Sequence, residues 1–181
     1  MFEVEVKVRV PHDKIKQDLI QKGAEFAGAE EQNDIYFNSA ERDFAQTDEA
    51  LRIRSVNGAG EITYKGKKID TVSKTRPEYN SPVDADEMEN ILTALGYFVS
   101  GAVKKRREIY NWNNFIIGFD VVENLGEFVE VESNLRDASD KTEIQNEIDR
   151  IFEFLGNYGL SKEDSITTSY LEMVLENQKK Q

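Results

Sequence analysis

The chain has no cysteine among its 181 residues and a single histidine, His12. The missing cysteines exclude disulfides, thiol nucleophiles and thiolate-ligated zinc or iron–sulfur sites. One histidine argues against a histidine-based metal site and against a Ser-His-Asp triad. Because His12 stands at the start of the first expected helix, we expect it to cap that helix or to face solvent. Any bound metal is therefore expected to be a hard cation held by carboxylate oxygens.

Long apolar runs are also missing. No stretch approaches the roughly 18 consecutive apolar residues of a membrane-spanning helix. The first residues alternate charged side chains with valine, which is not the pattern of a signal peptide. We therefore expect a cytoplasmic protein with no membrane partner.

Positive charge is scarce, with 23 Lys and Arg against 35 Asp and Glu and a net charge of −12. A general nucleic-acid binder gains affinity by neutralising phosphates, so this excess of acid argues against a nucleic-acid partner. Apolar residues make up 39% of the chain, and no linker rich in Pro, Gly and Ser divides it. We expect one domain over residues 1–181, with a frayed tail at 176–181.

The spacing of apolar residues outlines the elements. Helical spacing predicts helices over residues 11–26, 84–95 and 139–155, and a shorter one over 170–176. Asn57-Gly58 and Asn113-Asn114 are expected turns between strands. Period-two alternation predicts strands over residues 2–10, 34–37, 51–56, 61–67, 97–111, 114–122 and 128–132. A weaker extended stretch at 72–78 brings the total to about eight strands.

The expected strands carry charge on one face and apolar side chains on the other. In residues 2–10 the valines alternate with charged residues, and four further strands repeat this division. The charged faces, in chain order, are Glu3, Glu5, Lys7 and Arg9; Arg52 and Arg54; Lys65 and Lys67; Lys105 and Arg107; and Glu130 and Glu132.

A charged strand face is ordinarily solvated, as on a half-exposed antiparallel sheet. Three details favour the opposite orientation. The charges repeat with little dilution by neutral polar residues, acidic and basic pairs occupy different strands, and the amphipathic helices need an apolar sheet face to cover. We therefore expect an α+β fold, a closed antiparallel eight-stranded β-barrel whose charged lining forms a tunnel, with helices packed on the outside.

A tunnel lined by cations and a few carboxylates suits a polyphosphate bound with a divalent metal. Lysine and arginine neutralise phosphate oxygens, while carboxylates bind Mg²⁺ or Mn²⁺ through oxygen. The sequence contains no G-x-x-x-x-G-K-[ST] motif, so a triphosphate would not be held by a P-loop. An acidic exterior around a basic tunnel would admit such a ligand and still reject nucleic acid.

A series of short motifs follows in order along the chain. They are Glu3-x-Glu5-x-Lys7, QNDIYF at 32–37, ALRIR at 50–54, TYKG at 63–66, RPE at 76–78, KRREIY at 105–110, DVVENLGEFVEVE at 120–132 and SYLE at 169–172. Together these motifs resemble the CYTH superfamily, the triphosphate tunnel enzymes, which include class IV adenylyl cyclases and thiamine triphosphatases. The segments at 32–37 and 120–132 look most like the class IV adenylyl cyclase branch.

The resemblance implies a role for each inward charge. It implies two sites for Mg²⁺ or Mn²⁺, held by Glu3, Glu5, Asp120, Glu130 and Glu132. It implies phosphate binding by Lys7, Arg52, Arg54, Lys65, Arg76, Lys105 and Arg107. The five carboxylates and Lys7 would form the catalytic set. Arg9 and Lys67 lie nearer strand ends and rank lower, and parity places Lys104 and Arg106 on the exposed face.

The reaction implied by the resemblance is the conversion of ATP to cyclic AMP and pyrophosphate, by attack of the ribose 3′-hydroxyl on the α-phosphorus. Two alternatives stay open. The same tunnel would also serve hydrolysis of inorganic, nucleoside or thiamine triphosphate, or binding of a polyphosphate or nucleotide without catalysis. Candidate contacts to the base are Tyr36, Phe37, Tyr110 and Tyr170. The resemblance also suggests a homodimer.

Overall fold

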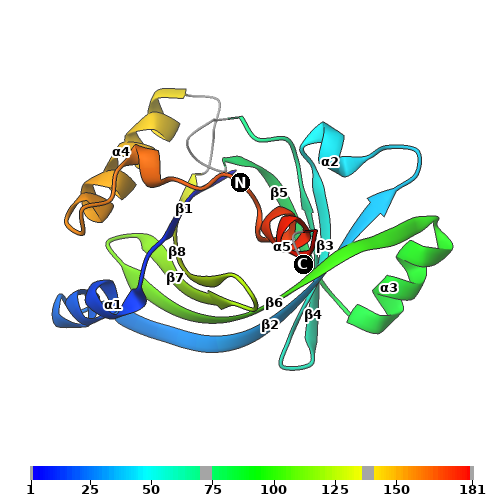
Figure 1. Ribbon diagram of the computed structural model, residues 1–181, viewed down its shortest axis with the longest axis horizontal. Coiled ribbons are helices and arrows are strands. Elements are labelled where there is room, and N and C mark those ends of the chain that lie inside the picture. The colour runs from blue at the N-terminus through cyan, green and yellow to red at the C-terminus, as the bar shows by residue number, and fades with distance from the viewer. Residues whose placement is uncertain (1, 70–74, 136–140, 180–181) are drawn as a thin grey trace.

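The computed structural model describes residues 2–69, 75–135 and 141–179, in which eight strands and five α-helices form (Figure 1). The strands are β1 (Phe2–Arg9), β2 (Glu25–Ser39), β3 (Ala50–Val56), β4 (Ala59–Lys65), β5 (Arg76–Val83), β6 (Tyr97–Trp112), β7 (Phe115–Val122) and β8 (Gly126–Leu135). The helices are α1 (His12–Gln21), α2 (Phe44–Thr47), α3 (Ala85–Ala94), α4 (Lys141–Gly156) and α5 (Tyr170–Gln178), with a 3₁₀ turn η1 (Lys162–Asp164).

The strands form one strongly curled antiparallel sheet in the order β1-β5-β4-β3-β2-β6-β7-β8. The first strand, β1, pairs with β8 along its whole length, from Phe2 opposite Leu135 to Arg9 opposite Phe128. Its pairing with β5 is limited to Phe2 opposite Pro77 and Glu3 opposite Arg76. The α+β class and the eight antiparallel strands are thus as predicted, whereas the sheet stays open along most of the β1–β5 seam. The prediction of a closed barrel is met only in part.

The apolar faces of the strands lie on the outer side of the curl, under helices. Val4, Val6 and Val8 are each 0% exposed and pack in one cluster with residues of α1 and α4, among them Leu19 and Ile148. Burying each valine contributes about 2 kcal/mol relative to leaving it in water. The helix α3 covers a second apolar cluster built on β2 and β3, part of which also borders the cavity described below. This arrangement turns the charged faces inward, as the alternation predicts.

One helix departs from the prediction that the helices pack outside. The C-terminal helix α5 lies on the concave side of the sheet (Figure 1). Its first residue, Tyr170, is buried in a cluster with Val103, Val122 and Phe128. These three residues share the inward parity of Lys105, Asp120 and Glu130 on their strands, so one end of the tunnel lining is apolar. These apolar side chains must also be shielded from water, and α5 packs over them.

Several elements differ in length from the sequence prediction. The helix α1 ends at Gln21 instead of residue 26, because Gly23 turns the chain with φ of 82° and β2 begins at Glu25. The strand β2 is much longer than residues 34–37, and β6 pairs with it throughout. Its first half has few buried side chains and hence no apolar alternation to read.

The remaining boundaries are close to expectation. The expected strand at 72–78 forms only from Arg76, and residues 72–74 lie outside the described part, as do 139 and 140 of the third expected helix. The expected frayed tail is helical through Gln178. Both predicted turns form, and Asn57 and Asn113 adopt positive φ of 49° and 48°. Among the helices described, none is long and apolar enough to cross a membrane.

Candidate active site

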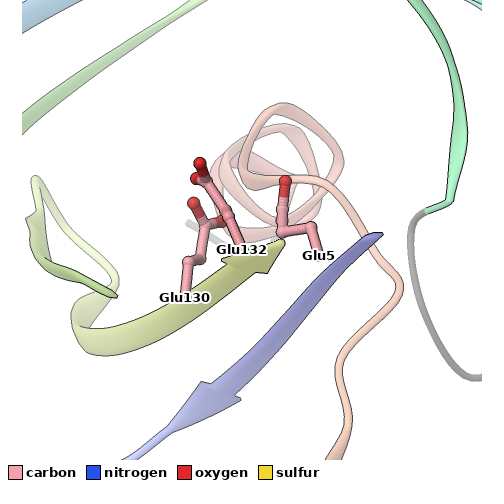
Figure 2. Close-up of side chains that lie close together, drawn as sticks. All are labelled: Glu5, Glu130 and Glu132. Carbon is pink, nitrogen blue, oxygen red and sulfur yellow. The ribbon is translucent and has the colours of Figure 1, made fainter. Parts of the chain in front are cut away.

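Three inward carboxylates converge where β1 and β8 meet. Glu130 and Glu132 lie two residues apart on one face of β8, and the sheet register places Glu5 of β1 directly opposite Glu132. One carboxylate oxygen from each of the three lies within 4.8 Å of the others (Figure 2). Oxygen donors at this spacing match the ligand preference of Mg²⁺ and Mn²⁺. This carboxylate trio, Glu5, Glu130 and Glu132, therefore fits a hard divalent cation.

The charge around the trio favours such a cation. Burial raises the pKa of Glu132, and the neighbouring Glu5 and Glu130 raise it further, although Arg107 opposes them. A cation between these oxygens would stabilise the ionised form and so lower the pKa of Glu132. Of the other predicted metal ligands, Glu3 is described only by its backbone, which lies opposite Asn134 and Arg76.

The fifth predicted metal ligand, Asp120, has cationic neighbours. It is fully buried, and its two oxygens accept hydrogen bonds from Arg107 at 2.7 Å each, from Lys105 Nζ at 2.8 Å and from the Tyr170 hydroxyl at 2.9 Å. Burial raises the pKa of Asp120, but the charges of Arg107 and Lys105 outweigh this and hold it below its usual value. The structure therefore does not bring Asp120 into the carboxylate trio.

Arg107 connects the two groups of carboxylates. Besides Asp120, its guanidinium donates to Glu130 and, at 3.0 Å, to Glu132. Gly118 on β7 makes room for it, because a Cβ there would lie 3.0 Å from Arg107 Cζ. The predicted phosphate ligand thus reaches into the space between the predicted metal ligands.

A second cationic group lies on β2 and β3. Arg54 donates to both oxygens of Asp34, at 2.7 and 2.8 Å, and Arg52 lies 3.8 Å from the same carboxylate. Arg52 also donates to Thr63 Oγ1 at 3.0 Å, but its buried Nε has no hydrogen-bond partner among the described residues. Asp34 was not a predicted site residue. The signal that would have identified it is its position directly opposite Arg54, and this register is not readable from the sequence alone.

The other predicted phosphate ligands divide into two kinds. Lys65 lies opposite Glu78, with 2.7 Å between the charged atoms, and Arg76 contributes to the same cavity. Lys7, in contrast, does not line the cavity. Its side chain is fully buried, and its Nζ donates to the carbonyl of Thr168 at 2.5 Å. The parity of Lys7 is as predicted, but its ammonium group is directed at the segment that leads into α5.

One cavity of about 440 Å³ joins these groups. The charged part of its wall includes Glu5, Glu130, Glu132, Arg52, Arg54, Lys65, Arg76, Lys105 and Arg107. Another part is apolar and includes Tyr36, Phe37, Phe44, Leu51, Leu171 and Leu175. Of the four candidate aromatics, Tyr110 is not in this wall. It packs in the outer core against Phe26 and Phe119.

The charged residues that were ranked lower as phosphate ligands, or predicted on the outer face of the sheet, lie on the surface. Arg9 and Lys67 are exposed, as are Lys104 and Arg106. His12 is an exception to its prediction, because it is only 5% exposed and its Nε2 lies 2.9 Å from the carbonyl oxygen of Phe128. It therefore neither faces solvent nor lies in the cavity wall.

A family model described as the CYTH domain matches residues 1–170. The chain belongs to the CYTH family. Enzymes of this family are the metal-dependent triphosphate tunnel enzymes to which the sequence motifs pointed. The carboxylate trio is a donor set that suits their metal.

Relatives of known sequence or structure extend the match over nearly the whole chain. A protein of Methanocaldococcus jannaschii that is provisionally named an adenylate cyclase is 39% identical, covering 96% of this chain and 98% of its own. The solved structure of a Pyrococcus horikoshii protein is similar with a TM-score of 0.85 at 36% identity, covering 96% of this chain and 98% of that one. A Hippeastrum protein, described as having a dominant triphosphatase activity, shares the fold with a TM-score of 0.68 at 15% identity, covering 98% and 95%.

Proposed function

We propose that the protein is an adenylyl cyclase of the class IV kind, which converts ATP to cyclic AMP and pyrophosphate with Mg²⁺ or Mn²⁺. The observation that carries this proposal is the composition of one cavity wall. The carboxylate trio and a set of lysines and arginines form one part of it, and aromatic and aliphatic side chains form another. A metal-bound triphosphate complements the first part, and a nucleoside complements the second.

The unpaired donor of Arg52 supports an anionic ligand. A buried N–H group without an acceptor costs free energy, and a phosphate oxygen in the cavity would supply that acceptor. Asp34, which also lines the cavity, pairs with both arginines and holds their guanidinium groups at the cavity wall. Arg52 and Arg54 would therefore be held in place for phosphate before the ligand arrives.

The size of the cavity favours an organic triphosphate. Small-molecule sites commonly occupy ~300–1,000 Å³ and combine apolar walls with a few placed polar groups. The cavity here, about 440 Å³, includes Tyr36, Leu171 and Leu175 beyond the charged side chains. Inorganic triphosphate has no apolar portion to place against these residues, whereas an adenine ring does.

In the proposed reaction the residues of the chain bind and orient the substrate. Lys65, Arg52, Arg54 and Arg76 would hold the phosphates, and the trio Glu5, Glu130 and Glu132 would hold one cation, with Glu3 and Asp120 as further candidates for a second. The bound cation would supply charge neutralisation and lower the pKa of the attacking hydroxyl. A bond forms between the 3′-oxygen and the α-phosphorus, the bond from that phosphorus to the β-phosphate oxygen breaks, and the hydroxyl proton passes to water.

There are two alternatives to the cyclase, a triphosphatase and a binding protein without catalysis. In a triphosphatase the same cations would hold the chain of phosphates while water attacks a terminal phosphorus. The activity described for the Hippeastrum protein is the reason to test for this one. In a non-catalytic nucleotide or polyphosphate sensor, binding would occur without products. The match over residues 1–170 supports a single domain in each case.

The test is product identification. The protein is incubated separately with ATP, inorganic triphosphate and thiamine triphosphate, each with Mg²⁺ or Mn²⁺. Cyclic AMP and pyrophosphate from ATP are expected, and Glu132→Gln should abolish them while Glu153→Gln, an exposed change on α4, leaves them unchanged. Orthophosphate without cyclic AMP would instead establish the triphosphatase, and tight binding without products would establish the sensor.

A further inference from the structure

The segment before α5 is fastened to the centre of β1. The amide of Ile166 donates to the carbonyl oxygen of Lys7 at 2.8 Å, and Lys7 Nζ donates to the carbonyl of Thr168 at 2.5 Å. Lys7 therefore holds this segment through its backbone and through its side chain. The residue after Thr168, Ser169, caps α5, and its hydroxyl accepts a hydrogen bond from the amide of Glu172 at 3.1 Å. The start of α5 is thereby fixed beside the charged lining.

At that point Tyr170 enters the lining. Its side chain is 7% exposed, and its ring lies 4.2 Å from Lys7 Nζ and 4.8 Å from Lys105 Nζ, measured to the ring centroid. An aromatic face at this distance attracts an ammonium group, and more strongly when water is excluded. One ring thus contacts both of the buried lysines that the sequence motifs assigned to phosphate binding.

The hydroxyl of Tyr170 extends the contact to a third cation. It donates to Asp120 Oδ2 at 2.9 Å, and the same oxygen accepts from Lys105 at 2.8 Å and from Arg107 at 2.7 Å. Tyr170 therefore helps to fix Asp120, which orients Lys105 and Arg107. Burial and the charges of Glu130 and Asp120 raise the pKa of Tyr170 well above its ordinary value, so its hydroxyl stays a donor.

Beyond Tyr170 the helix continues along the cavity. Leu171 and Leu175 are part of the cavity wall, and both pack against Gly101 of β6. A Cβ at Gly101 would lie 2.6 Å from Leu171 Cδ1 and 3.5 Å from Leu175 Cδ2, so the glycine allows this close approach. The docking of α5 and the arrangement of the cationic wall are thus parts of one packing arrangement.

We propose that Tyr170 is a positioning residue, which couples the docked C-terminal helix to Lys7, Lys105 and Arg107 and thereby sets the affinity of the cavity for triphosphate. This inference rests on the proposed function, because it assumes that these cations bind phosphate. It goes beyond that function in assigning the C-terminal helix a part in the affinity of the site.

The test compares Tyr170→Phe, which removes only the hydroxyl, with Tyr170→Leu, which also removes the ring. The matched control is Tyr158→Phe, because Tyr158 donates to Asp18 in a similar tyrosine–aspartate pair that lies outside the cavity wall. Binding of inorganic triphosphate is measured by calorimetry with EDTA present, so that the cations alone are reported. Mn²⁺ binding without triphosphate is measured by electron paramagnetic resonance and reports the carboxylate trio.

Tyr170→Phe is expected to weaken triphosphate binding about three- to tenfold, and Tyr170→Leu more strongly, with Mn²⁺ binding and melting temperature close to wild type. The control should bind triphosphate like the wild type. Unchanged binding in Tyr170→Phe would overturn the inference. So would a parallel loss of triphosphate binding, Mn²⁺ binding and thermal stability, which is the result expected of a merely structural residue.

A second readout does not depend on the proposed function. Acylation of lysines in the ligand-free protein, followed by mass spectrometry, reports how well Lys7 and Lys105 are held, with the exposed Lys162 as internal reference. Faster labelling of Lys105 is expected in both Tyr170 variants and faster labelling of Lys7 in Tyr170→Leu, and wild-type labelling rates would overturn the positioning role. If wild-type protein fails to bind any triphosphate, the proposed function fails, while the labelling still decides whether Tyr170 positions the two lysines.

Discussion

Arg54 and Asp34 face each other across β2 and β3 in a two-pronged hydrogen bond, with Arg54 Nε 2.7 Å from one carboxylate oxygen and a terminal nitrogen 2.8 Å from the other. Asp34 is 1% exposed and also neighbours Arg52. A single buried carboxylate thus balances two arginines of the cavity wall. It keeps both guanidinium groups close together in spite of their mutual repulsion.

Removing this balance should destabilise the fold. Asp34→Asn leaves two buried arginines without their shared counter-ion, and we expect it to lower the free energy of unfolding by about 3 kcal/mol. Urea denaturation measures this loss. The control is Asp149→Asn, because Asp149 pairs with Lys162 on the surface, where such pairs contribute little. Equal effects of the two substitutions would contradict the role given to Asp34.

The same pair predicts how stability depends on pH. Burial raises the pKa of Asp34, but the hydrogen bond from Arg54 and the charges of Arg52 and Arg54 outweigh this and lower it from 3.8 to about 2. Because the folded-state pKa is the lower one, the contribution is fully present above about pH 4 and is lost as the pH falls toward 2. It amounts to about 2 kcal/mol. The difference in unfolding free energy between wild type and Asp34→Asn should shrink over that interval, and a constant difference would contradict the assignment.

Metal binding should be sensitive to pH through Glu132. Its pKa is raised by burial and by Glu5 and Glu130, so a proton must leave before the trio can bind a cation with all three carboxylates. Mn²⁺ affinity of the wild type is expected to rise with pH through a range above 4.5, the ordinary glutamate value. Glu132→Gln should weaken Mn²⁺ binding about tenfold or more and flatten this dependence. A titration of Mn²⁺ affinity against pH in both proteins checks the prediction, and a pH-independent wild type would refute it.

Arg107 and a metal ion should compete for the trio. Since Arg107 donates to both Glu130 and Glu132, its positive charge lies close to where the cation would bind. Arg107→Gln is expected to raise Mn²⁺ affinity about tenfold by removing this repulsion, while weakening the binding of triphosphate. Calorimetry with each ligand separately measures both effects. Weaker Mn²⁺ binding in this variant would show that Arg107 organises the trio instead of competing for it.

The alternation of residues predicted the inner and outer faces of β1 because that strand is regular and covered by helices. Val4, Val6 and Val8 are fully buried on the outer side, while Glu5 faces the cavity. Where the chain is less regular the prediction lost detail. The strand β2 has pairing irregularities between Phe26 and Gly28 and between Tyr36 and Phe37, and no local pattern reveals its full length.

Contacts between distant segments could not be predicted from the sequence. Lys7 has the expected inward parity, yet its ammonium group bonds to Thr168, which is 161 residues away in the chain. Tyr170 was a candidate for contacting the base, and its bond to Asp120 depends on where α5 docks. Charge parity along a strand determines which side of the sheet a residue faces. Which partner it meets there depends on register and on the path of the C-terminal segment.

The cross-strand arrangement of the inner charges also bears on how the sheet folds. Arg54 pairs with Asp34, Lys65 with Glu78 and Arg107 with Asp120, each from directly opposite positions on neighbouring strands. A strand that slipped by one residue would turn its charges toward the apolar exterior core and break these pairs together. Misaligned sheets are therefore penalised by the same side chains that we propose bind the substrate, and selection for catalysis on this chain is at the same time selection for correct strand alignment.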